Sequence, residues 1–114
     1  MSQVQQGSII RARVTDPSGG NAKARPLVVI SKTSEIERDG IFFAVAITGE
    51  FSDPLADDEI LLPWDASRKC KTGLVKRCVA KCSWMRELPL TDVIEIKGHL
   101  GGSILDAVVT QSGL

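Results

Sequence analysis

Short apolar runs of strand length, separated by clusters of turn residues, limit most strongly what this chain can fold into. The runs Leu27–Ile30 and Ile41–Thr48 are apolar almost throughout and rich in β-branched residues, which is typical of strands buried on both faces. Apolar and polar residues alternate over Gly7–Val14 and again over Arg77–Trp84. This period of two predicts two further strands, each half-buried.

Shorter strands are expected at Glu59–Leu62 and Val93–Ile96, while Thr33–Gly40 fits either a helical turn or a hairpin loop. Ser103 is followed three residues later by Asp106, which matches a helix-start capping pattern and predicts a short C-terminal helix. Five or six short strands with turns between them indicate a mainly β fold. A small barrel or a sandwich with an attached helix would satisfy this pattern.

The 114 residues have the length of one domain, and without repeats or linkers we expect 1–114 to form a single domain. Apolar residues make up 43% and charged residues 25%, an ordinary globular composition. No run approaches the roughly 20 apolar residues of a membrane helix. The first residues also lack the pattern of a signal peptide. We therefore expect a cytoplasmic protein with no membrane partner.

Basic and acidic residues balance at 14 each, but they are segregated along the chain. An acid-free run contains Arg68, Lys69, Lys71, Lys76, Arg77, Lys81 and Arg86. A run without bases contains Glu50, Asp53, Asp57, Asp58 and Glu59. The basic run could form a surface for a phosphate backbone, although two solvated faces of opposite sign would give the same pattern.

The cysteines and the single histidine do not make a convincing metal site. Cys70, Cys78 and Cys82 contain no C-x-x-C pair, and His99 is the only other nitrogen or sulfur ligand of this kind. We expect reduced core thiols, with Cys78 and Cys82 on the buried strand face beside Trp84. His99 falls in a turn and should lie on the surface. We predict no metal and no other cofactor.

Arg25 stands at the end of a turn-rich loop, directly before Pro26 and the run Leu27–Ile30. Because proline restricts the preceding residue to extended conformations, the backbone of Arg25 is held. A held guanidinium offers a planar fork of donors to a phosphate. Thr48 ends the other apolar strand, where its hydroxyl can donate to a phosphate oxygen. An ordinary surface arginine and a strand-ending threonine would give the same pattern.

These motifs resemble, in order, the MazF/PemK family of toxins from bacterial toxin–antitoxin pairs. They are GSII at 7–10, KARPLVVIS at 23–31, AIT at 46–48 and GLVKRCV at 73–79, followed by GHL at 98–100 and the expected helix. The resemblance implies an SH3-like barrel with a C-terminal helix, usually as a homodimer. It also implies an antitoxin partner that covers the site with an acidic, flexible tail.

The activity implied by the resemblance is metal-independent cleavage of single-stranded RNA, leaving a 2′,3′-cyclic phosphate and a 5′-hydroxyl. The family's catalytic pair falls on Arg25 and Thr48. Because the RNA's own 2′-hydroxyl is the nucleophile, no protein nucleophile is needed, and stabilising the charge that develops on the phosphorane oxygens is a leading contribution. The expected RNA-binding residues are Lys23, Arg68, Lys69, Lys71, Lys76 and Arg77. The alternative is a non-catalytic module of the same fold, such as a gyrase-type toxin or a degenerate RNA- or protein-binding relative.

Overall fold

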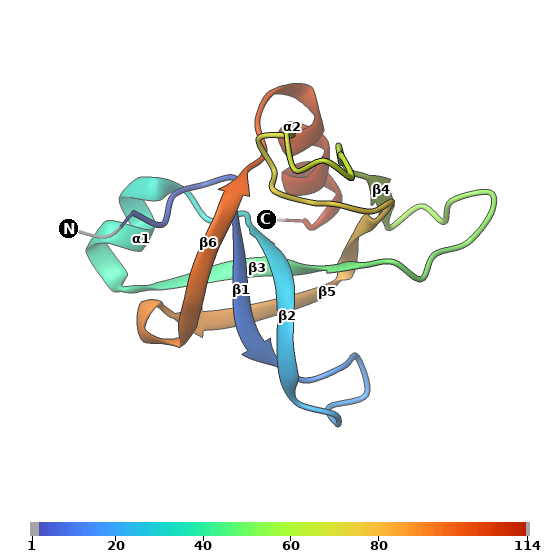
Figure 1. Cartoon of the computed structure of the whole chain (residues 1–114). Coiled ribbons are helices and arrows are strands. Elements are labelled where there is room, and N and C mark those ends of the chain that lie inside the picture. Colours follow the sequence, from blue (N-terminus) through green and yellow to red (C-terminus); the bar gives the residue numbers. More distant parts are fainter. Residues whose placement is uncertain (1–2, 114) are drawn as a thin grey trace.

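A computed structural model describes residues 3–113 and is dominated by a six-stranded antiparallel sheet (Figure 1). The strands lie side by side in the order β4-β5-β3-β2-β1-β6. The elements are β1 (Ser8–Val14), β2 (Lys23–Val29), α1 (Thr33–Asp39), β3 (Ile41–Thr48), β4 (Glu59–Leu61), β5 (Val79–Pro89), η1 (Leu90–Asp92), β6 (Val93–His99) and α2 (Gly102–Gln111). The expectation of a mainly β fold is therefore confirmed.

The sheet is not closed as a barrel, although the fold is of the mainly β class that the sequence predicts. Within residues 3–113, β4 and β6 are edge strands with no ladder between them. The segment after β4 approaches β6 only through isolated contacts, such as the N–H of His99 donating to the carbonyl oxygen of Lys71 at 2.8 Å. A Cβ on Gly98 would collide with that same carbonyl, so glycine is required where the two segments cross. A three-residue β4 is too short to continue the ladder.

The strongly twisted sheet buries side chains on both of its faces. In Figure 1, β1, β2 and β6 run across the direction of β3 and β5, and α2 covers the end near β4. The strand expected at Leu27–Ile30 sends Val28 and Ile30 into one buried cluster. Its neighbours Leu27 and Val29 enter a second cluster on the opposite face. This confirms that the run is buried on both sides.

The helices differ from expectation in one detail. The segment Thr33–Gly40 is a helix rather than a hairpin loop, and it ends at Gly40, whose φ of 71° is the left-handed conformation that glycine tolerates. The C-terminal helix is present, but the capping prediction for Ser103 is wrong. The N-cap is Gly101, two residues before Ser103, so the helix begins at Gly102, and no side chain caps it. No helix within residues 3–113 has the length and apolar character needed to cross a membrane.

A bulge divides β5 into two parts. The adjacent residues Val45 and Ala46 on β3 pair with Met85 and Lys81, which are four positions apart on β5. Residues 82–84 therefore have no partners in this ladder. Because side chains alternate between the faces of a strand, inserting an odd number of residues exchanges the two faces beyond the bulge.

The exchange moves Trp84 away from the cysteines. Cys78 and Cys82 enter the buried cluster beneath α2 as expected, and Met85 packs against the same cluster. Trp84 instead turns to the opposite face, where its indole Nε1–H donates to the carbonyl oxygen of Thr15 at 3.1 Å. The prediction that Trp84 shares the face of the two cysteines is wrong.

Candidate functional site

Arg25 and Thr48 lie together where β2 enters the sheet and β3 leaves it. Leu27 pairs with Ala46, so continuing the antiparallel register by two residues places Arg25 opposite Thr48. Both residues line a cavity of about 850 Å³, which we call the Arg25 groove, and a smaller adjoining one of about 280 Å³. The Arg25 groove also contains residues from the 15–22 loop, from the segment before β5 and from β5 itself.

The guanidinium of Arg25 is held by three contacts. Its Nε–H donates to the carbonyl oxygen of Val14 at 3.3 Å, and Nη2 donates to the carbonyl oxygen of Asn21 at 2.9 Å. Its central carbon lies 5.0 Å from the ring centroid of Trp84, within cation–π range. Within residues 3–113 these two hydrogen bonds leave three of the five guanidinium N–H groups for a ligand.

The loop that holds Arg25 is organised by the carboxylate of Asp16. It accepts hydrogen bonds from the N–H and the hydroxyl of Ser18, from the N–H of Gly20 and from the side-chain amide of Asn21. These bonds, led by that of the Ser18 hydroxyl, lower the pKa of Asp16 to about 2. From β5, Arg86 donates to the carbonyl oxygen of Asp16 at 2.7 Å, which ties the loop to the sheet.

The hydroxyl of Thr48 can donate to a ligand. Its oxygen accepts the backbone N–H of Glu50 at 3.1 Å, and among residues 3–113 no acceptor takes its proton. Thr48 is half-buried, while Glu50 is exposed and lines the same groove. A guanidinium and a hydroxyl therefore face one space that is open to solvent.

Three of the six residues expected to bind RNA line the Arg25 groove, and three do not. Lys23, Lys76 and Arg77 line the Arg25 groove, and Arg77 lies over the ring of Phe51 with 5.3 Å between guanidinium carbon and centroid. Lys71 lies instead in a separate groove with His99. The two remaining residues are exposed and line neither the Arg25 groove nor the cavity that adjoins it: Arg68 and Lys69.

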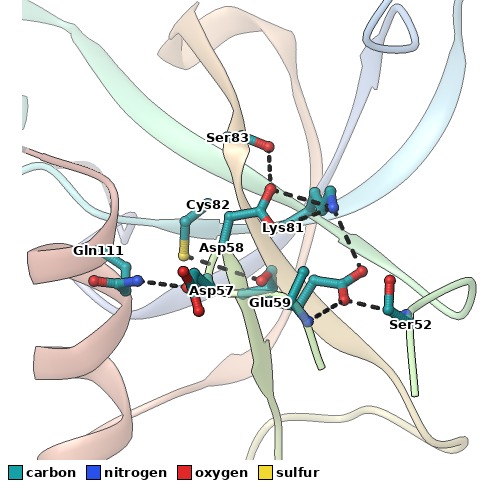
Figure 2. A network of polar contacts seen from close by, with 10 residues as sticks. Ser52, Asp57, Asp58, Glu59, Lys81, Cys82, Ser83 and Gln111 are labelled. Carbon is teal, nitrogen blue, oxygen red and sulfur yellow. Dashed lines mark hydrogen bonds and ion pairs between the residues drawn. The ribbon is translucent and has the colours of Figure 1, made fainter. Parts of the chain in front are cut away.

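The acidic and basic runs meet in space at Lys81. The ammonium of Lys81 lies 3.2 Å from a carboxylate oxygen of Asp58 and 3.4 Å from one of Glu59 (Figure 2). Glu59 is 6% exposed and accepts the backbone N–H groups of Ser52 and Ala56, and the bond from Ala56 contributes most to lowering its pKa. These contacts fix the 50–59 loop against β5. They also neutralise Lys81, which lines the groove.

The cysteines and the histidine take no part in the groove's polar contacts. Cys78 and Cys82 are buried free thiols whose pKa burial raises, which confirms the expectation of core thiols for these two. Cys70 is not a core thiol; it is half-buried in a loop, and the hydroxyl of Thr72, 3.3 Å from its sulfur, lowers its pKa. His99 is exposed, as expected. Among residues 3–113 no three His, Cys, Asp or Glu side chains cluster to hold a metal ion.

Comparison with solved structures identifies the architecture. The structure matches a chain of the MazE–MazF complex from Deinococcus radiodurans with a TM-score of 0.73 and 17% identity, over 99% of this chain and 95% of that chain. The chain has the MazF fold. The structure also matches an endoribonuclease from a mycobacterial species with a TM-score of 0.70 and 14% identity, over 99% of this chain and 90% of that chain. A third match is Mycobacterium tuberculosis toxin MazF-mt6, with a TM-score of 0.65 and 16% identity, over 91% of this chain and 92% of that chain.

Scans of protein-family models and of curated protein sequences give no match. At identities of 14–17% the likeness establishes the MazF fold that the motif order predicted. The chemistry of the groove is argued from its residues. A guanidinium with free N–H groups and a hydroxyl can together stabilise an oxyanion on phosphorus, without a protein nucleophile.

Two contributors to the groove are not among the site residues expected from the sequence. One is Asp16, although its spacing to Ser18 is that of a side chain that bonds its own backbone two residues on. The other is Trp84, because the regular alternation before it predicts the face of Cys78 and Cys82 rather than a contact with Arg25. Nothing in the local sequence reveals the bulge that turns it to Arg25.

Proposed function

We propose that this protein is a MazF-family toxin, an endoribonuclease that cleaves single-stranded RNA, including mRNA, without a metal ion. One observation carries the proposal: Arg25 and Thr48 come from different strands and line the same groove. Three basic side chains that could neutralise phosphates surround them. Cleavage of mRNA would stop translation and growth, and this is the activity that an antitoxin would neutralise.

The proposed reaction uses the substrate's own nucleophile. The 2′-hydroxyl oxygen attacks the adjacent phosphorus and loses its proton, while the bond from phosphorus to the 5′-oxygen breaks and that oxygen gains a proton. The products are a 2′,3′-cyclic phosphate and a 5′-hydroxyl. Negative charge builds up on the non-bridging oxygens in the transition state. Arg25 donates to these oxygens with its free N–H groups, and Thr48 adds a hydroxyl hydrogen bond.

The flanking RNA would lie along the basic side of the groove. Lys23, Lys76 and Arg77 are exposed there and would contact neighbouring phosphates. The pair of Arg77 and Phe51 adds planar groups on which an unpaired base could stack. Lys81 is left out of this set because its charge is already paired with Asp58 and Glu59.

An antitoxin partner, a homodimer and a cytoplasmic location belong to the same proposal. The similar structures include a MazE–MazF complex and a mycobacterial endoribonuclease in complex with its cognate antitoxin. An acidic tail would compete with RNA for the Arg25 groove, because both present negative charge to the same basic side chains. The cytoplasm is where the mRNA substrate is found.

The test is incubation of the purified protein with a long RNA in the presence of EDTA, followed by mapping of both new ends. We expect cuts at a short recurring sequence, cyclic phosphate ends, and no cutting by Arg25→Ala. Arg38→Ala removes an exposed arginine on α1 and is the matched control that should cut normally. Intact RNA at high protein concentration would overturn the proposal. RNA binding without cleavage would favour the non-catalytic module instead.

A further inference from the structure

Trp84 lies in direct contact with the arginine on which the proposed reaction depends, although nothing in its sequence position placed it there. We propose that Trp84 is a positioning residue: its ring holds the Arg25 guanidinium at the orientation in which the free N–H groups reach the reacting phosphate. The inference rests on the proposed function for its catalytic consequence. The contact itself can be tested without any RNA.

The exposure of the two side chains supports a positioning role. Trp84 is only 7% exposed, whereas Arg25 is half-buried and opens to the groove. A ring covered to this extent cannot serve as a platform for an RNA base. The guanidinium carbon lies 5.0 Å from the ring centroid, so Arg25 itself covers part of the ring. A cation–π contact uses none of the N–H donors of the arginine, which therefore stay available to a phosphate.

The ring is itself held in place. Its Nε1–H donates to the carbonyl oxygen of Thr15 at 3.1 Å, and Arg86 on the same strand donates to the carbonyl oxygen of Asp16. Arg25 donates to two further carbonyl oxygens, that of Val14 at the end of β1 and that of Asn21 in the loop. The loop, the ring and the guanidinium thus form one connected unit, anchored on β5. Displacing the ring would release one side of Arg25 and one anchor of the loop that holds the other side.

The bulge in β5 is what brings the ring to this place. Cys82 lies in the buried cluster beneath α2, and with regular alternation Trp84 would follow it there. The register shift between Val45 and Ala46 turns Trp84 to the opposite face instead. Bulges often serve to re-aim a side chain next to a functional site. Here the re-aimed side chain is the one beneath Arg25.

A ring that only fills space would behave differently from one that positions Arg25. Loss of a space-filling ring would lower the temperature of unfolding and leave the activity of the folded fraction unchanged. Loss of a positioning ring would slow cleavage at saturating protein, while the lysines of the groove would still bind RNA with unchanged affinity. The two roles are therefore separated by measuring rate, affinity and stability on the same variants.

The experiment compares Trp84→Leu, which removes the π face, with Trp84→Phe, which keeps a smaller one. Trp64→Leu is the matched control, because Trp64 is 44% exposed and lies outside the Arg25 groove. We expect the single-turnover rate of Trp84→Leu to fall about 10- to 100-fold, the loss typical of a slightly misplaced catalytic group. Its affinity for an oligonucleotide with a 2′-O-methyl group at the cleavage site should not change. Trp84→Phe should keep most of the rate, and the control should match the wild type.

A second measurement reads the contact directly. In the NMR spectrum of the protein alone, the Nε–H resonance of Arg25, assigned by its loss in Arg25→Lys, should be shifted upfield by the indole ring current. The shift should shrink in Trp84→Phe and vanish in Trp84→Leu. A wild-type resonance without this shift would overturn the proposal, even if Trp84→Leu fails to fold. A folded Trp84→Leu with an unchanged rate would also overturn it. Absence of cleavage by the wild type would refute the proposed function but not the contact.

Discussion

Replacing Thr48 by valine removes one hydroxyl from the Arg25 groove and leaves the shape of the side chain almost unchanged. In the folded protein this hydroxyl accepts the N–H of Glu50 at 3.1 Å and keeps its own proton for a ligand. The substitution therefore deletes one donor to the developing charge on phosphorus. It leaves Arg25 and the basic residues in place, so RNA affinity should be retained.

The size of the effect follows from the openness of the site. Removing one preorganised oxyanion donor from an enclosed active site costs about 100- to 1,000-fold in rate. Thr48 is half-buried beside a groove that water enters, and water can replace part of the lost hydrogen bond. We therefore expect a loss of about 10- to 100-fold, or about 1.4–2.7 kcal/mol in the barrier. The exposed N–H of Glu50 can bond to water, so stability should change by less than about 0.5 kcal/mol.

The assay is single-turnover cleavage of a short RNA in EDTA, together with thermal unfolding of each variant. Thr48→Ser keeps the hydroxyl and should stay near the wild-type rate. Thr110→Val, at an exposed position on α2 outside the groove, controls for the exchange of a threonine for a valine. The reasoning is refuted if Thr48→Val cleaves within about threefold of the wild type while Arg25→Ala is inactive. The hydroxyl would then not reach the reacting phosphate.

Four further substitutions test other parts of the structure. Folding lowers the pKa of Asp16 from 3.8 to about 2, so its ionised carboxylate stabilises the fold fully at pH values above 3.8. This contribution is lost as the pH falls towards 2. Asp16→Asn should therefore make the unfolding temperature depend less on pH in this acid range. Lys76→Ala and Arg77→Ala should each weaken RNA binding and reduce the slope of log affinity against log salt by about 0.7, measured by fluorescence anisotropy. The controls for that slope lie outside the groove: Arg68→Ala and Lys69→Ala. Gly98→Ala should lower the unfolding temperature because its Cβ would collide with a crossing backbone segment, whereas Gly20→Ala, whose Cβ has 3.9 Å of clearance, should not.

The strands and their burial could be predicted because they depend on local pattern. Alternate residues of a strand face opposite sides, so the run Leu27–Ile30 predicted burial on both faces, and the two core clusters confirm it. The extended conformation of Arg25 follows from the proline after it. The open sheet could not be predicted in this way, because closure depends on whether β4 and β6 meet, and their residues are far apart in the sequence.

The candidate site likewise has features that the local sequence predicts and features that only long-range packing decides. The types of residue that could act on a phosphate, Arg25 and Thr48, were evident from the order of motifs, because a loop-ending arginine and a strand-ending threonine are local features. Their meeting in one groove depends on the register of β2 against β3, which long-range pairing sets. The support from Trp84 depends on a bulge in β5, and the loss of Lys81 from the basic surface depends on Asp58 and Glu59 folding against it. Hydrophobic period and turn chemistry act over a few residues and can be read along the chain, whereas strand register and ion pairing are settled only when distant segments pack together.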